Sequence, residues 1–260
     1  MGGDNSPDAT LNGAYLASQS LGKEETIVLV GNEKLAKSWF KSNNIDTSVF
    51  EFIHADEVIS MNEHATKALR KKPNNSISVG FNALKNKEID VFSSAGNSGA
   101  MLVGSMFSIG PIKGVIRPSI TSVLPKKNGG VGLILDVGVN ADCKPDVLFQ
   151  FAILGSLFAE NVYNIQKPKV GLLNIGEEKG KGNLLTQSTF QLLEDNDDIN
   201  FVGNVEGRDL FNDKADVIVC DGFTGNVVLK LAESFYSLID QKNIKDDYFD
   251  RFNYEIYGGT

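Results

Sequence analysis

Short apolar runs rich in β-branched residues alternate along this chain with segments whose apolar positions recur at helical spacing. Several runs are apolar on both faces, which is typical of parallel strands covered by helices on both sides. The predicted strands are 26–31, 89–93, 120–124, 131–137, 169–175, 200–205 and 216–220. The predicted helices are 7–20, 33–42, 57–70, 99–109, 146–164, 183–195 and 224–240.

This order of elements predicts an α/β fold, a three-layer α/β/α sandwich with a mostly parallel, doubly wound sheet. No internal repeat or linker marks a boundary, so residues 1–260 are expected to form a single domain. The polar stretch 241–255 is expected to be a surface excursion. The segment 146–164 is apolar nearly all round, which predicts burial in the core or against a second subunit.

Composition narrows the classes of function. A formal net charge of -8 argues against a general nucleic-acid binder, which needs a basic face. The N-terminus has no signal-peptide pattern, and no apolar run reaches the roughly 20 residues that span a bilayer. Cys143 and Cys220 lack the spacing of a zinc site or a disulfide framework, so a reducing cytoplasm fits best.

Five predicted strands are followed by segments rich in Gly, Asn, Asp, Glu and Lys, which are 94–99, 136–145, 174–183, 204–209 and 221–226. The carboxyl ends of parallel strands meet at one edge of a sheet, where ligands bind. Glycines allow close approach of the backbone, and helix N-termini offer N–H donors to an anion. Any one such loop is more often a plain turn. Five at one edge favour a phosphate-like ligand.

No protein nucleophile is indicated. The P-loop pattern, the full GxGxxG fingerprint and the GxSxG elbow are all missing from the sequence. His54 and His64 fall in a polar early region and are expected at the surface. Cys220 could be a thiol nucleophile, but a buried structural cysteine is the more frequent case. We therefore expect the bound anion itself to attack an electrophile.

The chain resembles the bacterial phosphate acyltransferase family over residues 1–240, in the segments MGGDNSPDA, SAGNSGA, RPSI, LDVGVNADCKP, LLNIGEEKGKGN, FVGNVEGRD and VCDGFTGNVVLK. That family is similar in fold to phosphotransacetylases and to isocitrate and isopropylmalate dehydrogenases. The resemblance implies that acyl-[acyl carrier protein] and inorganic phosphate give acyl phosphate and free carrier protein, for phospholipid synthesis. It implies no metal and no organic cofactor.

The resemblance also implies a cytoplasmic homodimer with a peripheral membrane contact. Family members usually have a short strand ahead of the GGD segment and a further apolar segment after YGG. This chain is therefore expected to lack a short N-terminal strand and a C-terminal segment. The polar stretch 241–255 also lacks the apolar segment by which family members are thought to touch the membrane, which puts the membrane contact in question.

Catalysis is assigned by the resemblance to Lys181, which would neutralise phosphate or oxyanion charge, and to Asn226, whose amide would donate to the carbonyl oxygen. Asn97, Ser98 and Gly99 are expected to cradle phosphate at the start of helix 99–109. The other residues expected to bind phosphate or substrate are Asp4, Asp136, Asn140, Asp142, Lys144, Asn174, Glu177, Asn183, Asn204, Glu206, Asp221, Gly222, Thr224 and Gly225. Because unpaired carboxylates would repel phosphate, we expect some of the carboxylates of Asp4, Asp136, Asp142 and Asp221 to pair with Lys144, Arg117 or Arg208.

Two alternatives stay open beside the carrier-protein reaction. One is a phosphotransacetylase acting on a coenzyme A thioester, and the other is a non-catalytic anion-binding protein. The carrier protein is acidic, so a chain of net charge -8 should need a basic patch to meet it. The candidates for that patch are Lys126 with Lys127, or Arg70 with Lys71 and Lys72.

Overall fold

The computed structural model describes residues 2–3 and 5–257, apart from the side chains of Tyr254 and Tyr257. The chain divides into two compact units, Met1–Ile112 (the first unit) and Lys113–Thr260 (the second unit). Each unit has its own sheet and its own apolar clusters. A single domain over residues 1–260 stays a prediction.

The first unit contains a pair of parallel strands, β1 (Ile27–Gly31) and β2 (Phe50–His54). Helix α2 (Glu33–Ser42) joins them and begins at Asn32, whose side chain accepts a hydrogen bond from the Leu35 N–H. Phe40 of α2 is fully buried and stacks on Phe50 of β2, with ring centroids 4.7 Å apart. The other α-helices described in this unit are α1 (Asp8–Ser18), α3 (Ala65–Lys71), α4 (Ser76–Lys85) and α5 (Ser98–Ser108).

The sequence prediction is wrong at several places in this unit. Residues 89–93 form no strand, because Phe92 packs edge-to-face on Phe81 of α4 instead of pairing in a sheet. Phe92 lies so close to Gly80 that a Cβ there would be 2.3 Å from its ring. The predicted helix 57–70 shrinks to α3, and both β2 and α4 were missed.

The second unit is built on a five-stranded sheet of order β3-β4-β7-β5-β6. Strand β3 (Thr121–Pro125) runs antiparallel to β4 (Val131–Leu135). The neighbours β4 and β7, β7 and β5, and β5 and β6 are parallel. The bounds of the remaining strands are β5 Val170–Leu173, β6 Phe201–Val205 and β7 Val217–Val219. The sequence therefore located all five strands of this sheet.

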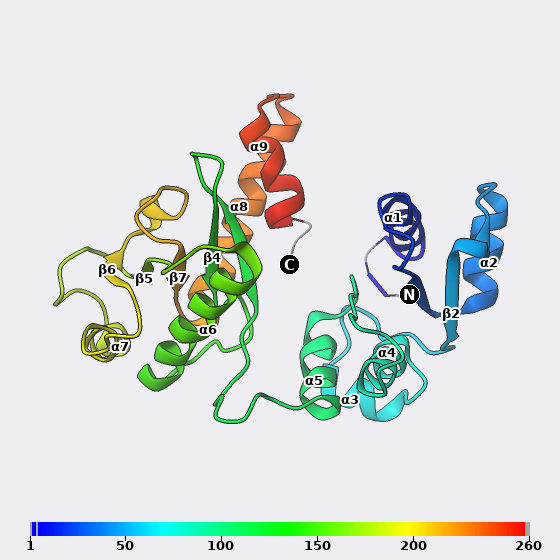
Figure 1. Cartoon of the computed structure of the whole chain (residues 1–260), viewed down its shortest axis with the longest axis horizontal. Coiled ribbons are helices and arrows are strands. Elements are labelled where there is room, and N and C mark those ends of the chain that lie inside the picture. The colour runs from blue at the N-terminus through cyan, green and yellow to red at the C-terminus, as the bar shows by residue number, and fades with distance from the viewer. Residues whose placement is uncertain (1, 4, 258–260) are drawn as a thin grey trace. The chain divides into compact units, whose positions relative to one another are not determined.

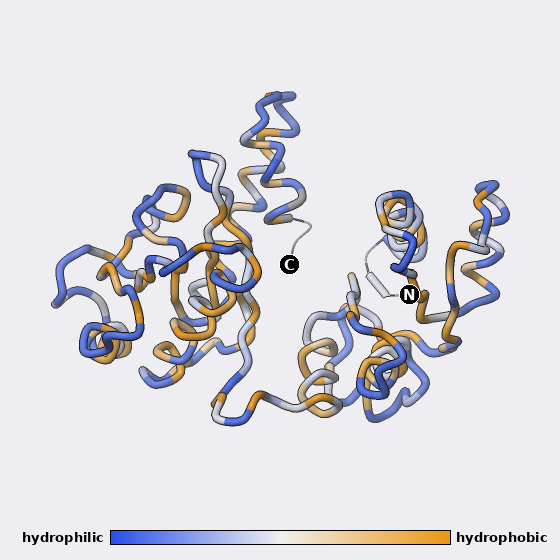
Figure 2. The backbone as a smooth tube through the Cα atoms, viewed as in Figure 1, coloured by the Kyte–Doolittle hydropathy of each residue, from blue (hydrophilic) through white to orange (hydrophobic). Residues whose placement is uncertain are grey.

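Helices cover both faces of this sheet, so the second unit is a three-layer α/β/α sandwich (Figure 1). Leu133 and Val217 pack with α6 (Pro145–Tyr163) and α7 (Leu184–Glu194) on one face. Ile134 and Ile218 pack with α8 (Gly222–Gln241) on the other face. Figure 2 shows hydrophobic residues along the strands and the blue of polar residues at the loop tips. Burial on both faces agrees with the pattern in the sequence.

Helix α6 is buried on one side only within the chain. Phe151 and Ala152 are fully buried, whereas Leu157 and Val162 are about half exposed. The prediction of burial all round is therefore not met by the chain alone. No helix within the described residues is long and apolar enough to cross a membrane.

The C-terminal stretch is not a surface excursion, which corrects the sequence prediction for 241–255. It forms α9 (Asp247–Arg251) and a π-helix, η3 (Phe252–Tyr257). Phe252 and Ile256 are buried in the apolar cluster on the α8 face of the sheet. The polar residues between Phe252 and Ile256 obscured this pattern in the sequence.

Candidate functional site

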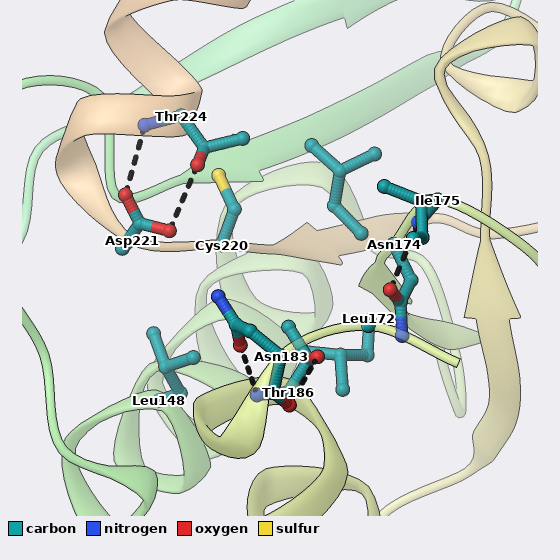
Figure 3. A pocket seen from close by; sticks show the side chains of 11 residues that line it. Leu148, Leu172, Asn174, Ile175, Asn183, Thr186, Cys220, Asp221 and Thr224 are labelled. Atoms are coloured by element: carbon teal, nitrogen blue, oxygen red, sulfur yellow. Dashed lines mark hydrogen bonds between the residues drawn. The ribbon is translucent and has the colours of Figure 1, made fainter. Parts of the chain in front are cut away.

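A pocket of about 450 Å³ lies at the carboxyl ends of β5 and β7 in the second unit (Figure 3). The helix that follows β5 packs on one face of the sheet, and the helix that follows β7 packs on the other. Open α/β sheets bind ligands where connections diverge in this way. The polar side chains that line the pocket are Asn174, Asn183, Thr186, Asp221 and Thr224, and the apolar ones include Leu148, Leu172, Leu173 and Ile175.

Two capped helix N-termini meet at this pocket. Asn183 caps α7, with its Oδ1 accepting from the Thr186 N–H at 2.9 Å. Asp221 caps α8 by accepting from the N–H of Thr224 at 2.9 Å and from its hydroxyl at 2.8 Å. In Figure 3 the amide nitrogen of Asn183 points toward the side of the pocket formed by Cys220 and Asp221. Helix N-termini favour an anion, as does the Asn183 amide, for which the described residues offer no acceptor, whereas the Asp221 carboxylate opposes one.

The loop 174–183 is anchored by two asparagines. Asn174 donates from Nδ2 to Asn204 Oδ1 and to the Lys181 carbonyl, both at 3.1 Å. Asn204, only 2% exposed, donates to the Glu178 carbonyl at 3.0 Å. Both side chains therefore position the segment that carries Lys181.

Lys181 is exposed, and its Cγ lies 3.0 Å from the position that a Cβ on Gly176 would take. It forms no ion pair with any residue that the structure describes. Lys179, in the same loop, instead pairs with Glu194. Gly182, next to Lys181, has φ +91, a left-handed conformation that favours glycine. Lys181 is thus a cation with no ion-pair partner among the described residues, in a loop whose next residue, Gly182, lines the pocket.

Asp136 and Asn140 organise the loop after β4. Asp136 is fully buried, and its carboxylate accepts from the Asn140 N–H at 2.6 Å and from the Asn140 side chain at 2.8 Å. The Ile120 N–H donates to the same carboxylate at 3.1 Å. These contacts occupy the Asp136 carboxylate within the protein, so it shapes the loop, and a role toward phosphate stays a prediction.

Helix α8 begins against this loop. The Gly222 N–H donates to the Asn140 carbonyl at 2.8 Å, and a Cβ on Gly225 would lie 1.9 Å from the Asp136 carbonyl oxygen. Both positions therefore need glycine for close packing. Asn226 is exposed, and its Oδ1 lies 3.3 Å from where a Cβ on Gly138 would be. The Asn226 amide thus lies over the same loop.

Three carboxylates from the loops after β5 and β6 bring their oxygens within 4.8 Å of one another: Glu177, Glu206 and Asp209. Lys214 Nζ lies 2.7 Å from Glu177 and 3.1 Å from Asp209. Arg208 pairs with Glu206, and not with one of the aspartates for which the sequence analysis expected a partner. Two cations therefore offset two of the three negative charges of this cluster.

Several predicted site residues are not among those that line the pocket. Asn97, Ser98 and Gly99 begin α5 in the first unit. The Asn97 side chain is buried and caps α5 while donating to three backbone carbonyls, so it is fully engaged within the protein. Asp4 lies outside the described residues. Asp142 and Lys144 are exposed in the loop after β4, where Arg117 donates to the Asp142 carbonyl and not to its carboxylate.

The two cysteines behave as structural residues. Burial, with Asp221 and Asp136 nearby, raises the pKa of the Cys220 thiol well above its ordinary value. Burial also raises the pKa of Cys143 to about 11, again with a contribution from those carboxylates. Both thiols therefore hold their protons at neutral pH and are poor nucleophiles. His54 and His64 are exposed, as expected.

The basic patch proposed at Lys126 and Lys127 is wrong for Lys126. That side chain is only 4% exposed, and its Nζ lies 2.5 Å from Asp216 Oδ1. In the other candidate patch, Lys72 pairs with Glu63, while Arg70 and Lys71 are exposed. A buried, paired lysine cannot attract a partner protein.

The structure brings together in one pocket four of the predicted residues, Asn174, Asn183, Asp221 and Thr224. Their roles stay predictions. Sequence reasoning missed Thr186, which also lines the pocket. Thr186 could have been predicted from its position three residues after the helix cap Asn183, because the N–H at that position donates to the side chain of the cap.

Comparisons with known proteins agree with this fold. A family model described as "Fatty acid synthesis protein" matches residues 1–250. The phosphate acyltransferase of Halothermothrix orenii is 47% identical over 92% of this chain and 71% of its own length. That of Acetivibrio thermocellus is also 47% identical, over 94% of this chain and 74% of its own length.

Two solved structures with little sequence similarity to this chain share its fold. The EutD phosphotransacetylase from Staphylococcus aureus matches with a TM-score of 0.64 and 16% identity, over 91% of this chain and 81% of that chain. A branched-chain phosphotransacylase from Enterococcus faecalis V583 matches with a TM-score of 0.61 and 14% identity, over 90% of this chain and 82% of that chain. The predicted fold class is thereby confirmed.

Proposed function

We propose a reaction for this chain from the premise that it belongs to the phosphate acyltransferase family and is therefore an acyltransferase. The acyl group of a thioester on acyl carrier protein passes to inorganic phosphate, and the acyl phosphate serves phospholipid synthesis. The observation that carries this proposal is the pocket where α7 and α8 begin. It offers helix N-termini to an anion, while the thiol that lines it, Cys220, keeps its proton.

In this reaction a phosphate oxygen attacks the thioester carbonyl carbon, and the carbon–sulfur bond breaks. The proton of hydrogen phosphate ends on the departing thiol, so no cofactor is needed to balance the step. The protein must hold phosphate close to the carbonyl and stabilise the oxyanion that forms. The Asn183 amide and the first turns of α7 and α8 supply donors for the phosphate, which leaves the oxyanion to other groups.

Lys181 and Asn226 are the groups proposed for the transition state. Lys181 has no carboxylate partner among the described residues, so its charge is available to phosphate or oxyanion. The exposed Asn226 amide would donate to the carbonyl oxygen. A charge-assisted hydrogen bond contributes roughly 1.5–3 kcal/mol, so its loss should lower the rate roughly ten- to a hundredfold.

The test is phosphate-dependent release of free carrier protein from palmitoyl-[acyl carrier protein]. Lys181→Ala should lower turnover by roughly ten- to a hundredfold, with the fold unchanged by circular dichroism. Lys179→Ala is the matched control, because this lysine lies in the same loop but is paired with Glu194. Equal turnover in the two variants would reject Lys181 as a catalytic residue.

The identity of the acyl donor is tested by comparing turnover of thioesters on coenzyme A with turnover of thioesters on acyl carrier protein. Turnover of coenzyme A thioesters in preference to carrier-bound thioesters would make the chain a phosphotransacetylase. Phosphate binding without turnover of either donor would leave a non-catalytic anion-binding protein. The curated relatives named phosphate acyltransferases support the first proposal, and the distant structural neighbours support only the fold.

We also propose a cytoplasmic homodimer with a peripheral membrane contact. Helix α8 supports the dimer, because Val227, Leu231, Phe235 and Leu238 are each more than half exposed and recur every three to four residues. This spacing forms one apolar stripe along the helix. Light scattering on the wild type and on Leu231→Glu tests the dimer, and sedimentation with anionic vesicles tests the membrane contact.

A further inference from the structure

Lys181 lies between two glycines, Gly180 and Gly182, in the loop that leads into α7. Glycine loses more conformational freedom on folding than any other residue, so a Gly-Lys-Gly segment is costly to hold in one conformation. The two glycines have no side chains with which to pack the backbone in place. A fixed position of the Lys181 backbone must therefore come from hydrogen bonds to this segment.

Side-chain amides hold three consecutive carbonyl groups here. Gln187 Nε2 donates to the Gly180 carbonyl at 3.0 Å and to the Gly182 carbonyl at 3.1 Å. Between them, the Lys181 carbonyl accepts from Asn174 Nδ2 at 3.1 Å. A side-chain amide has two N–H donors, so one glutamine can serve both acceptors. Gln187 thus bridges the carbonyls on either side of Lys181.

Helix α7 places Gln187 where its side chain reaches back over the loop. Asn183 caps this helix, and Gln187 is its fourth residue. Side chains of a helix lean toward its N-terminus, so a long amide at this position extends past the cap to the residues before it. Gln187 itself is not among the residues that line the pocket.

We propose that Gln187 is a positioning residue for Lys181, whose backbone it fixes so that the lysine ammonium is held at the reacting atoms. This inference rests on the proposed function, because Lys181 carries the catalytic role there. Gln187 acts only through the backbone of residues 180–182. When that backbone is free to move, the ammonium is less well placed and stabilises the transition state less.

The experiment replaces the amide with a side chain of similar length. Gln187→Met keeps a good helix former but removes both donors. The kcat for phosphate-dependent release of free carrier protein from palmitoyl-[acyl carrier protein] should fall roughly three- to tenfold, since two hydrogen bonds exposed to water are lost. The KM for the carrier-bound thioester should stay at the wild-type value, because the lost stabilisation belongs to the transition state.

Two comparisons separate positioning from a general effect on the helix. In a Lys181→Ala background, Gln187→Met should cause no further loss of kcat, because there is no ammonium left to position. Gln191→Met is the matched control, four residues further along α7. The Gln191 amide donates to the Asp195 carboxylate at 3.0 and 2.9 Å and not to the loop, so kcat should stay at the wild-type value.

Hydrogen exchange of the backbone amides of residues 179–183 gives a measurement that does not depend on turnover. The Lys181 N–H donates to the Glu178 carbonyl at 3.0 Å, a bond that opens when the segment moves. Exchange in this segment should be faster in Gln187→Met than in the wild type. It should be unchanged in Gln191→Met.

Each outcome decides the proposal. A loss of kcat that disappears in the Lys181→Ala background, together with faster exchange, supports it. The proposal is overturned by wild-type kcat in Gln187→Met, by a loss that multiplies with that of Lys181→Ala, or by an equal loss in Gln191→Met. If the wild type releases no carrier protein, or Lys181→Ala matches it, the proposed function fails instead. The exchange data then decide by themselves whether Gln187 holds this backbone.

Discussion

Gly182→Ala tests how the pocket is built, because this glycine is enclosed by groups that shape the site. A Cβ at residue 182 would lie 2.1 Å from Thr186 Oγ1 and 2.4 Å from Asn174 Oδ1. The backbone also has φ +91, which side chains of L-residues rarely adopt. Asn174 cannot simply swing away, since it holds the Lys181 carbonyl and Asn204.

The expected cost has two parts. The left-handed conformation costs a non-glycine residue about 1–2 kcal/mol, and the overlap with packed neighbours costs about 1–3 kcal/mol more. Together they should lower the free energy of unfolding by about 2–5 kcal/mol. A chain of this size loses about 2–4 °C in Tm for each kcal/mol. If the loop rearranges locally, Tm falls less, but the backbone that positions Lys181 is displaced and turnover falls.

The control is Gly180→Ala in the same loop. Nothing lies within 4 Å of a Cβ at residue 180, so alanine fits there. Thermal unfolding and phosphate-dependent turnover of both variants would be measured together. The reasoning would be refuted by a Gly182→Ala protein that matches the wild type in both assays, or by equal damage from Gly180→Ala.

Three further predictions concern buried polar groups. Asp136→Ala should lower the free energy of unfolding, measured with urea, by about 3–5 kcal/mol, because it leaves the Asn140 donors without an acceptor. A loss below about 1 kcal/mol would contradict this prediction. Lys126→Met should lower the free energy of unfolding by about 3–5 kcal/mol, because it leaves Asp216 without its ion-pair partner. The KM for carrier-bound substrate should stay unchanged, and a raised KM would instead support a role of Lys126 in binding the carrier protein. The folded Cys143 thiol keeps its proton to about pH 11, whereas an unfolded thiol loses it near the ordinary value of 9.0. Stability should therefore fall as pH rises from 9 to 11, and this fall should shrink in Cys143→Ser.

The sequence predicted the second unit better than the first because its strands are buried on both faces. Val217 and Ile218 pack on opposite faces of the sheet, so β7 reads as a continuous apolar run. In the first unit the apolar run 89–93 has a similar composition, but Phe92 is only partly buried against a helix and Val91 is 79% exposed. An apolar composition alone therefore fixes neither the burial of a segment nor the kind of element that it forms.

Sequence reasoning has a similar limit for the polar residues of the site. Asp136 and Asn183 both follow strands and both read as candidate ligand groups in the sequence. The first is enclosed by N–H donors of its own loop, and the second caps a helix at the pocket. The difference depends on which donors lie nearby after folding. Sequence reasoning therefore found the loops that build the pocket but not the direction in which each side chain points.

The neutral character of the pocket's donors fits a reaction in which the substrate supplies the nucleophile. An amide from Asn183, the hydroxyls of Thr186 and Thr224, and helix N–H groups do not titrate near neutral pH. The thiol that lines the pocket, Cys220, keeps its proton, and Asp221 caps α8, so neither supplies the nucleophile and the protein must act through position. Position here is set by Gly182, Gly222 and Gly225, which allow the helix starts and their loops to pack closely. The dependence of turnover on pH near neutrality should then follow the ionisation of phosphate, not that of a side chain in the pocket.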